Sequence, residues 1–97
     1  MEEEKKYERE KIAVVTGGVR GIGLGISLAL KKKGYRVYAL YSKDEKSAAA
    51  AQGEGVIPVK ADVRNEAEIV AFFSVLRHVD VLVNNAGIAV AAQLQDT

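Results

Sequence analysis

Short apolar runs alternate with segments of helical periodicity along this chain, which predicts a repeated strand–helix pattern. The first run, IAVVT at 12–16, is β-branched and apolar on both faces, as expected for a strand of a parallel sheet covered on each side. Apolar residues at helical spacing then predict a helix over 21–33, with lysines at its C-terminal end and Gly34 after it. The predicted apolar face of this helix comprises Ile22, Ile26, Ala29 and Leu30.

The second strand–helix unit follows directly. The run YRVYALY at 35–41 again has the composition of a strand. Ser42, with Glu45 three residues later, resembles a capping box that opens a short Ala-rich helix. Gly53 and Gly55 are expected to close this helix.

Two further strands complete the pattern. VIPVK at 56–60 predicts the third strand, and Pro58 places it at a sheet edge because proline cannot donate to a strand ladder. Asn65 and Glu68 form another capping pair, in front of a helix. The fourth strand is expected at 79–83, and after Ile88 the sequence allows another helix to begin. The apolar face of the helix between these strands comprises Ile69, Phe72, Phe73 and Leu76.

Alternating strands and helices predict an α/β fold with a doubly wound parallel sheet, because each connection is long enough for a right-handed crossover. A strand order of 3-2-1-4, as in the first half of a Rossmann-like dinucleotide fold, puts the third strand at the edge that Pro58 requires. Residues 1–11 are charged without an apolar stripe and are interpreted as a flexible lead-in. Residues 12–97 are interpreted as a partial dinucleotide-binding domain, truncated after its fourth strand.

Composition narrows the possible functions. The chain has 97 residues, 48% of them hydrophobic and 28% charged, with a net charge of +1, so no strong field attracts nucleic acid or an anionic membrane. It contains no Cys, which excludes disulfides, thiolate catalysis and cysteine-based zinc sites. No apolar run is long enough to span a bilayer, and the N-terminus does not resemble a signal peptide. A cytoplasmic location is the expectation, and no metal site is predicted.

The strongest functional signal is the glycine-rich segment between the first strand and the first helix. A pyrophosphate needs backbone N–H donors at a helix N-terminus, and side chains would obstruct its approach. The strand–loop–helix context makes nucleotide binding the favoured interpretation. The segment comprises Gly17, Gly18, Val19, Arg20, Gly21, Ile22 and Gly23.

The spacing Gly-x-x-x-Gly-x-Gly, with the sequence TGGVRGIG, resembles the cofactor loop of the short-chain dehydrogenase/reductase family. Asp62-Val63 after the third strand and NNAG at 84–87 after the fourth match two further motifs of that family in the right order. The resemblance covers residues 12 to about 90, which correspond to the first half of a family member. Within the family, the sequence most resembles NADPH-dependent 3-oxoacyl reductases.

The resemblance assigns roles to individual residues. It implies that Gly17, Gly21 and Gly23 shape the phosphate turn and that Ile22 approaches the cofactor through its backbone. Asp62 would hydrogen-bond the adenine, with Val63 beside it. Asn85, Ala86 and Gly87 would line the adenosine ribose, and Asn84 would steady the sheet. Without the family context, Asp62 is equally well explained as a loop residue and Gly87 as a turn former.

Cofactor choice depends on the end of the second strand, where an acid would hold the free 2′-hydroxyl of NAD. Tyr41 and Ser42 stand there instead. Arg20 and Lys43 can pair with a 2′-phosphate, and Ser42 can add a hydrogen bond, which favours NADP(H). The alternative interpretation is that Arg20 and Lys43 are solvated charges and Ser42 only caps a helix.

No catalytic residue is predicted in this chain. The family reduces a carbonyl with Ser, Tyr and Lys, the last two spaced Tyr-x-x-x-Lys, beyond the fourth strand. Tyr7 and Lys11 have this spacing but precede the first strand, so the match is interpreted as coincidence, because ligands bind at the carboxyl ends of parallel strands. His78 is interpreted as a surface or capping residue that closes a helix.

Three hypotheses follow. The first is the NADP(H)-binding N-terminal segment of a ketone or aldehyde reductase, not catalytic by itself. The second is a non-catalytic module, natural or designed, that binds a nucleotide or a phosphate anion. The third is a truncated, poorly folded product whose fourth strand has an unpaired apolar edge and promotes self-association.

Overall fold

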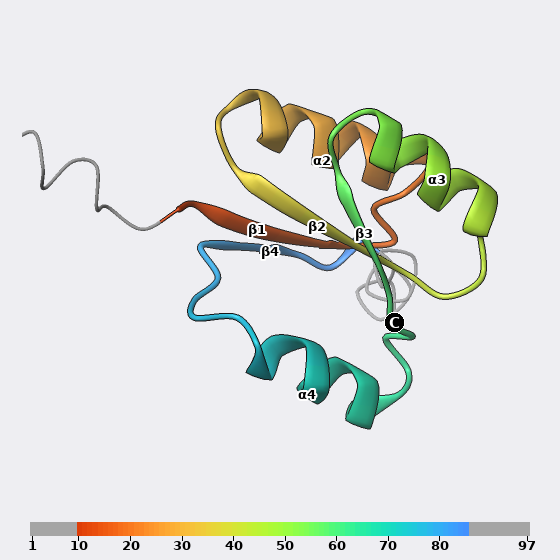
Figure 1. The fold of residues 1–97 in the computed structure, drawn as a ribbon, viewed down its shortest axis with the longest axis vertical. Helices are drawn as coiled ribbons and strands as arrows, with labels where there is room; N and C mark the ends of the chain where they lie inside the picture. The colour runs from red at the N-terminus through yellow and green to blue at the C-terminus, as the bar shows by residue number, and fades with distance from the viewer. Residues whose placement is uncertain (1–9, 86–97) are drawn as a thin grey trace, which may run out of the picture.

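The computed structural model describes residues 10–85, which form a parallel four-stranded sheet with helices on both faces (Figure 1). Helices α2 and α3 cover one face and α4 covers the other (Figure 1). The predicted doubly wound sheet is therefore confirmed. In chain order the elements are β1 (Ile12–Thr16), α2 (Gly21–Lys32), β2 (Arg36–Tyr41), α3 (Glu45–Gly53), β3 (Ile57–Lys60), α4 (Glu66–Ser74) and β4 (Val81–Val83).

The strand order is β3-β2-β1-β4, as the sequence predicts. Pro58 lies opposite Ala39 in the edge strand β3, so its missing N–H interrupts no ladder on the outer side. β1 is central, and all of its residues are buried. The carboxyl ends of β1, β2 and β4 consequently lie at one edge of the sheet, where such folds bind ligands.

Small side chains fill the core between the sheet and the pair α2 and α3. Because alanine and glycine occupy so little space, the helices approach the strands closely on this face. Half-buried apolar residues of α2 and β4 pack around this cluster. Its buried members are Ala13, Val15, Val19, Val37, Ala39, Ala48, Ala51 and Val56.

The buried face of α2 differs from the predicted one. Gly23 and Ser27 are its buried residues, whereas Ile22 is 76% exposed and Ala29 is also exposed. The hydroxyl of Ser27 donates to the carbonyl oxygen of Gly18 at 3.0 Å, which fixes the helix close to the loop that precedes it. The predicted placement of Ile22 and Ala29 on the apolar face is therefore wrong, because the buried face of α2 runs through Gly23 and Ser27, which pack against the loop.

The N-cap of α3 also differs from the prediction. The cap is Asp44, whose Oδ1 accepts from the Ser47 amide at 2.9 Å. Ser42 lies too far before the first helical residue to act as the cap, so the predicted Ser42–Glu45 box is wrong. Glu45 instead pairs with the ammonium of Lys60 at 2.8 Å and accepts from the hydroxyl of Tyr41 at 2.9 Å.

Helix α4 begins as predicted but packs loosely. Asn65 is its N-cap and accepts from the Glu68 amide at 3.2 Å. Phe72 contacts Tyr38 of β2 edge to face, with ring centroids 5.6 Å apart. None of the residues of α4 is buried, and Leu76, predicted on its apolar face, lies beyond its end.

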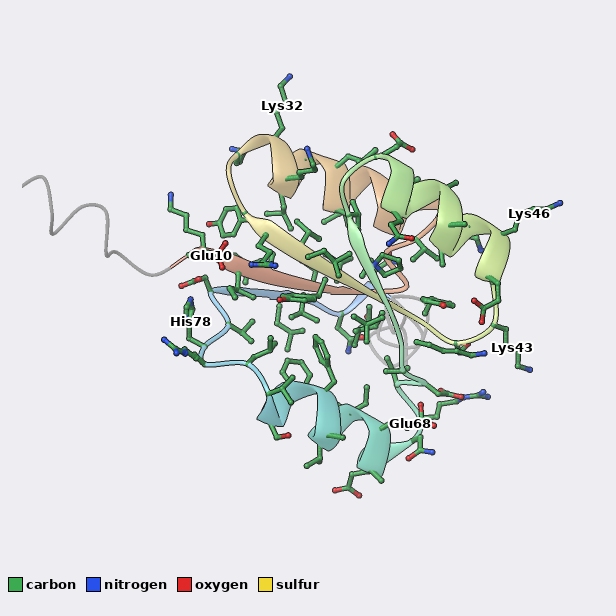
Figure 2. The ribbon with its side chains drawn as sticks, viewed as in Figure 1. Glu10, Lys32, Lys43, Lys46, Glu68 and His78 are labelled. Atoms are coloured by element: carbon green, nitrogen blue, oxygen red, sulfur yellow. The ribbon has the colours of Figure 1, made fainter. Side chains whose placement is uncertain are left out.

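Residues of the connection from α4 to β4 form hydrogen bonds with the backbone at the start of β1. His78 was predicted to close a helix, but α4 ends at Ser74, so that prediction is wrong. A ring nitrogen of His78 lies 2.6 Å from the carbonyl oxygen of Glu10, and Asp80 Oδ2 accepts from the Ile12 amide at 2.7 Å. Glu10 and His78 lie together at one end of the molecule, and Lys43 lies at the opposite end (Figure 2).

Two absences apply to residues 10–85. No helix in this range is long and apolar enough to cross a membrane. Within the same range, no group of His, Asp and Glu side chains is arranged to hold a metal ion. The charged segment 1–9 and residues 86–97, including Ala86 and Gly87, lie outside the described residues.

Candidate functional site

The glycine-rich loop lies at the carboxyl end of β1 and leads directly into α2. Gly17 begins the turn with a φ of 64° and donates its amide to the carbonyl oxygen of Leu40, at 2.8 Å, near the end of β2. Gly21 begins the helix with a φ of 60°, a region that residues with a side chain rarely adopt. The loop is thus tied to two adjacent strands at the edge where they end.

The start of α2 is open to an anion. Arg20 occupies the N-cap position in an extended conformation, and its side chain makes no capping hydrogen bond. The first turn also contains no acidic residue. The first amides of a helix have no acceptor within the helix, and Gly21 and Ile22 are exposed residues, so this helix start has the geometry that can accept a phosphate.

Close packing between α2 and the glycine-rich loop explains why residue 23 is glycine. A Cβ added to Gly23 would collide with the carbonyl oxygen of Gly17 and lie 2.6 Å from Asn85 Nδ2. The same amide nitrogen of Asn85 donates to the Gly17 oxygen at 3.1 Å. Gly23 therefore lets the helix start close against the loop, and Asn85 fixes the orientation of the loop carbonyl.

The end of β4 joins the loop through two asparagines. The Asn84 side-chain oxygen accepts from the Thr16 hydroxyl at 3.1 Å, which links the carboxyl ends of β4 and β1. Asn85 reaches the loop itself. The structure therefore places Asn84 against the end of β1 and Asn85 against the glycine-rich segment.

Asp62 follows β3 and carries the largest pKa shift in the site. The guanidinium and amide of Arg64 donate to its carboxylate, at 2.9 to 3.1 Å, and lower the pKa of Asp62 to about 2. Its own amide donates to Glu68 at the start of α4, at 3.0 Å. Val63 beside it is 43% exposed. Asp62 is thus an ionised acceptor held between β3 and α4.

The basic residues predicted to select the cofactor lie around the entry to α3. Arg20 is 76% exposed and forms an ion pair with Asp44, with Arg20 Nη1 3.3 Å from Asp44 Oδ2. Ser42 and Lys43 are exposed in the loop after β2, and Lys43 lies near enough to Asp62 to lower its pKa slightly. Hydrogen bonds from Ser47 lower the pKa of Asp44, and the nearby Arg20 adds to this effect.

Several residues of the site were not found by sequence reasoning. Asp44 was missed because Ser42 seemed the better cap, although Asp44 and Ser47 have the same capping spacing. The sequence offers no indication of the role of Ser27 except that it lies one helical turn after Gly23. The sequence offers no indication of a role for Arg64, which lies two residues after Asp62.

The sequence match to Tyr-x-x-x-Lys lies away from this site. Tyr7 is outside the described residues. Lys11 immediately precedes β1, at the end of the sheet opposite the glycine-rich loop, and its ammonium lies 5.8 Å from the ring centroid of Tyr35.

Comparison with known proteins agrees with this geometry. The family model described as short chain dehydrogenase matches residues 11–97. The acetoacetyl-CoA reductase of Shinella zoogloeoides is 46% identical over 83 residues, which cover 80% of this chain and 34% of that protein. The chain therefore spans about a third of the length of the curated relatives it matches.

Solved structures give the same result for the fold. The crystal structure of BdcA in complex with NADPH matches with a TM-score of 0.74 and 28% identity, over 80% of this chain and 32% of that one. The Pseudomonas aeruginosa RhlG/NADP complex matches with a TM-score of 0.63 and 34% identity, over 77% of this chain and 34% of the other.

Proposed function

Because this chain belongs to the short-chain dehydrogenase/reductase family, we propose that it is the NADP(H)-binding N-terminal part of an oxidoreductase that reduces a ketone or aldehyde. The observation that carries the proposal is the start of α2. Its first amides have no side-chain cap, and glycines leave room for a diphosphate in front of them. A nicotinamide cofactor supplies the hydride for such a reduction, and the residues of this chain bind and orient it.

Different residues are proposed to contact different parts of the cofactor. The amides of Gly21, Ile22 and Gly23 donate to the diphosphate. Asp62 accepts a hydrogen bond from the adenine amino group, and its low pKa keeps it ionised at neutral pH. Asn85 holds the loop carbonyl, so that the loop keeps its shape before the cofactor arrives. Val63 is proposed to lie beside the adenine, and the family resemblance implies that Ala86 and Gly87, which are outside the described residues, belong to the adenosine side.

NADP(H) is proposed over NAD(H) because of charge. Arg20 and Lys43 are exposed cations, and Ser42 between β2 and α3 provides a hydroxyl donor. Charge-assisted hydrogen bonds from such groups favour a 2′-phosphate over a 2′-hydroxyl. The similarity to the BdcA–NADPH and RhlG/NADP complexes supports this choice.

The proposed substrate class is a 3-oxoacyl compound. Its support is the 46% identity to an acetoacetyl-CoA reductase, whose named substrate is a 3-oxoacyl thioester. The reduction belongs to the whole protein, because this chain spans only about a third of such relatives. A cytoplasmic location is part of the same proposal, and a chain without Cys is compatible with a reducing compartment.

We also propose that β4 can pair with another chain. Among residues 10–85, β4 pairs with β1 alone, and Leu82 in its middle is 58% exposed. An unpaired strand edge is a template for further pairing, and a charge on it opposes this. Size-exclusion chromatography at increasing concentration should show self-association that Leu82→Lys reduces. A sharp monomer peak with cooperative unfolding would count against it.

Titration of the 97-residue chain with NADPH and with NADH tests the cofactor proposal. We expect tighter binding of NADPH, and a loss of about tenfold in NADPH affinity in Arg20→Ala, because a charged hydrogen bond to the 2′-phosphate is lost. The matched control is Lys32→Ala, which removes a cation from the other end of α2 (Figure 2). A wild-type chain without NADPH preference, or an Arg20→Ala variant that keeps it in full, would contradict the assignment.

A further inference from the structure

The cation best placed to recognise a 2′-phosphate is already engaged. Arg20 Nη1 lies 3.3 Å from Asp44 Oδ2, and Asp44 itself stands between β2 and α3 as the cap of α3. The sequence predicts cofactor-selecting roles for the basic residues here and for the strand end at Tyr41 and Ser42, and no such role for this carboxylate.

The carboxylate of Asp44 is fixed independently of Arg20. Its Oδ1 accepts from the Ser47 amide at 2.9 Å, and its Oδ2 accepts from the Ser47 hydroxyl at 2.8 Å. The Arg20 side chain, by contrast, is 76% exposed and comes from the loop. When the two separate, Arg20 therefore moves and Asp44 stays.

A phosphate that approaches Arg20 competes with Asp44 for the same guanidinium. It also meets a fixed negative charge, and like charges in proximity oppose binding. A 2′-hydroxyl, which carries no charge, meets neither effect. Resting on the proposed function, we infer that Asp44 is a specificity-determining residue that weakens NADP(H) binding and so sets the balance between NADP(H) and NAD(H).

The second predicted phosphate partner, Lys43, is exposed and lies in the same loop. Lys43 acts electrostatically on Asp62, which already accepts from Arg64. Of the two predicted phosphate partners, Arg20 therefore faces a carboxylate directly. The site is less cationic than Arg20 and Lys43 alone would make it, so the preference it produces is moderate.

Asp44→Asn tests the inference with little change of structure. The amide oxygen of the new side chain can still accept from the Ser47 amide, so α3 keeps its cap, while the charge that faces Arg20 is removed. In titrations of the full 97-residue chain at low salt, we expect NADPH affinity to rise by about three- to fivefold, the size of a surface ion pair, and NADH affinity to stay within about 1.5-fold. High salt should reduce the gain.

The matched control is Glu45→Gln, one residue away. It removes the same charge, but Glu45 is paired with Lys60 and Tyr41 rather than with Arg20. We expect the NADPH to NADH affinity ratio to change by less than about 1.5-fold. The double variant Arg20→Ala with Asp44→Asn is the second control, because the gain should vanish when the guanidinium is absent.

Each outcome distinguishes this inference from the proposed function. Weaker NADPH binding in Asp44→Asn, an equal gain in Glu45→Gln, or a gain that persists without Arg20 would overturn the inference. If Arg20→Ala loses the NADPH preference but Asp44→Asn changes nothing, the inference fails and the proposed cofactor stands. If the wild type shows no preference but Asp44→Asn gains one through Arg20, the inference holds and the proposed preference fails. If neither chain binds a dinucleotide, both fail.

Discussion

The two faces of the sheet are covered very differently. Between the sheet and the pair α2 and α3, small side chains form a fully buried cluster. On the other face, Val14 and Leu40 are buried in the sheet, yet none of the residues of α4 is buried. Leu82, which pairs in register with Val14, is 58% exposed on that face.

This difference shows where the precision of the site originates. On the α2 face, glycine, alanine and serine allow backbone to approach backbone, and the glycine-rich loop is set by those contacts. On the α4 face, the large rings of Tyr38, Phe72 and Phe73 hold the helix farther from the strands. A change of one methyl group should therefore matter on the first face and be tolerated on the second.

The largest effect is expected from an added methyl group at Gly23. Its Cβ would collide with the Gly17 carbonyl and crowd Asn85, so Gly23→Ala should destabilise the chain by about 3 kcal/mol or more and abolish NADPH binding. Gly25→Ala, in the same helix, meets nothing within 4 Å and should stabilise by about 0.5 to 1 kcal/mol. Urea unfolding of both variants measures the contrast, and equal effects would refute the close-packing account.

A smaller effect is expected when a buried valine of the α2 and α3 core is compared with an exposed valine at the end of α4. Val37 is 1% exposed within the α2 and α3 core, so Val37→Ala should cost about 2 kcal/mol in the free energy of unfolding. Val75, at the end of α4, is 77% exposed, and Val75→Ala should cost less than about 0.5 kcal/mol. Thermal or urea unfolding tests the pair, and a loss at Val75 as large as that at Val37 would mean that the α4 face is tightly packed.

The smallest effect concerns pH and the start of α4. The folded-state pKa of Asp62, about 2, lies below the ordinary value of 3.8, so its ionised form stabilises the fold above pH 3.8. That contribution should be lost as the pH falls from 3.8 towards 2. Asp62→Asn should therefore be less stable than the wild type at neutral pH, with the difference disappearing near pH 2.

Arg64→Ala provides the control for this pH effect. Because Arg64 is the main cause of the shift, its removal should return the pKa of Asp62 towards 3.8 in an NMR titration. An unchanged pKa in this variant would show that the pairing with Arg64 is not what holds Asp62 ionised.

Most of the fold follows from local patterns in the sequence. Strand composition located all four strands, although the fourth is shorter than 79–83 and begins at Val81. Pro58 correctly placed the third strand at an edge, which agrees with the order 3-2-1-4 expected for the first half of a dinucleotide fold. The glycines between β1 and α2 identified the loop, because few other structures need glycine at those positions.

What the sequence did not reveal depends on contacts between distant residues or on competition among neighbours. Ser42 and Asp44 are both good caps, and only the position at which α3 begins decides between them. The exposure of Ile22 depends on how close α2 lies to the sheet, which Gly18 and Ser27 determine through packing. His78 binds Glu10, 68 positions away, and no local pattern reports such a bond.

The hydrogen bond from Asn85 to Gly17 joins residues separated by 68 positions. During synthesis the N-terminal residues leave the ribosome first, but Gly17 must wait for β4 before its carbonyl is held. The glycine-rich loop is therefore among the first segments made, but the Asn85 hydrogen bond that holds its carbonyl can form only after β4 has been made. A nascent chain released before Asn85 would contain the glycines but lack the side chain that holds the Gly17 carbonyl.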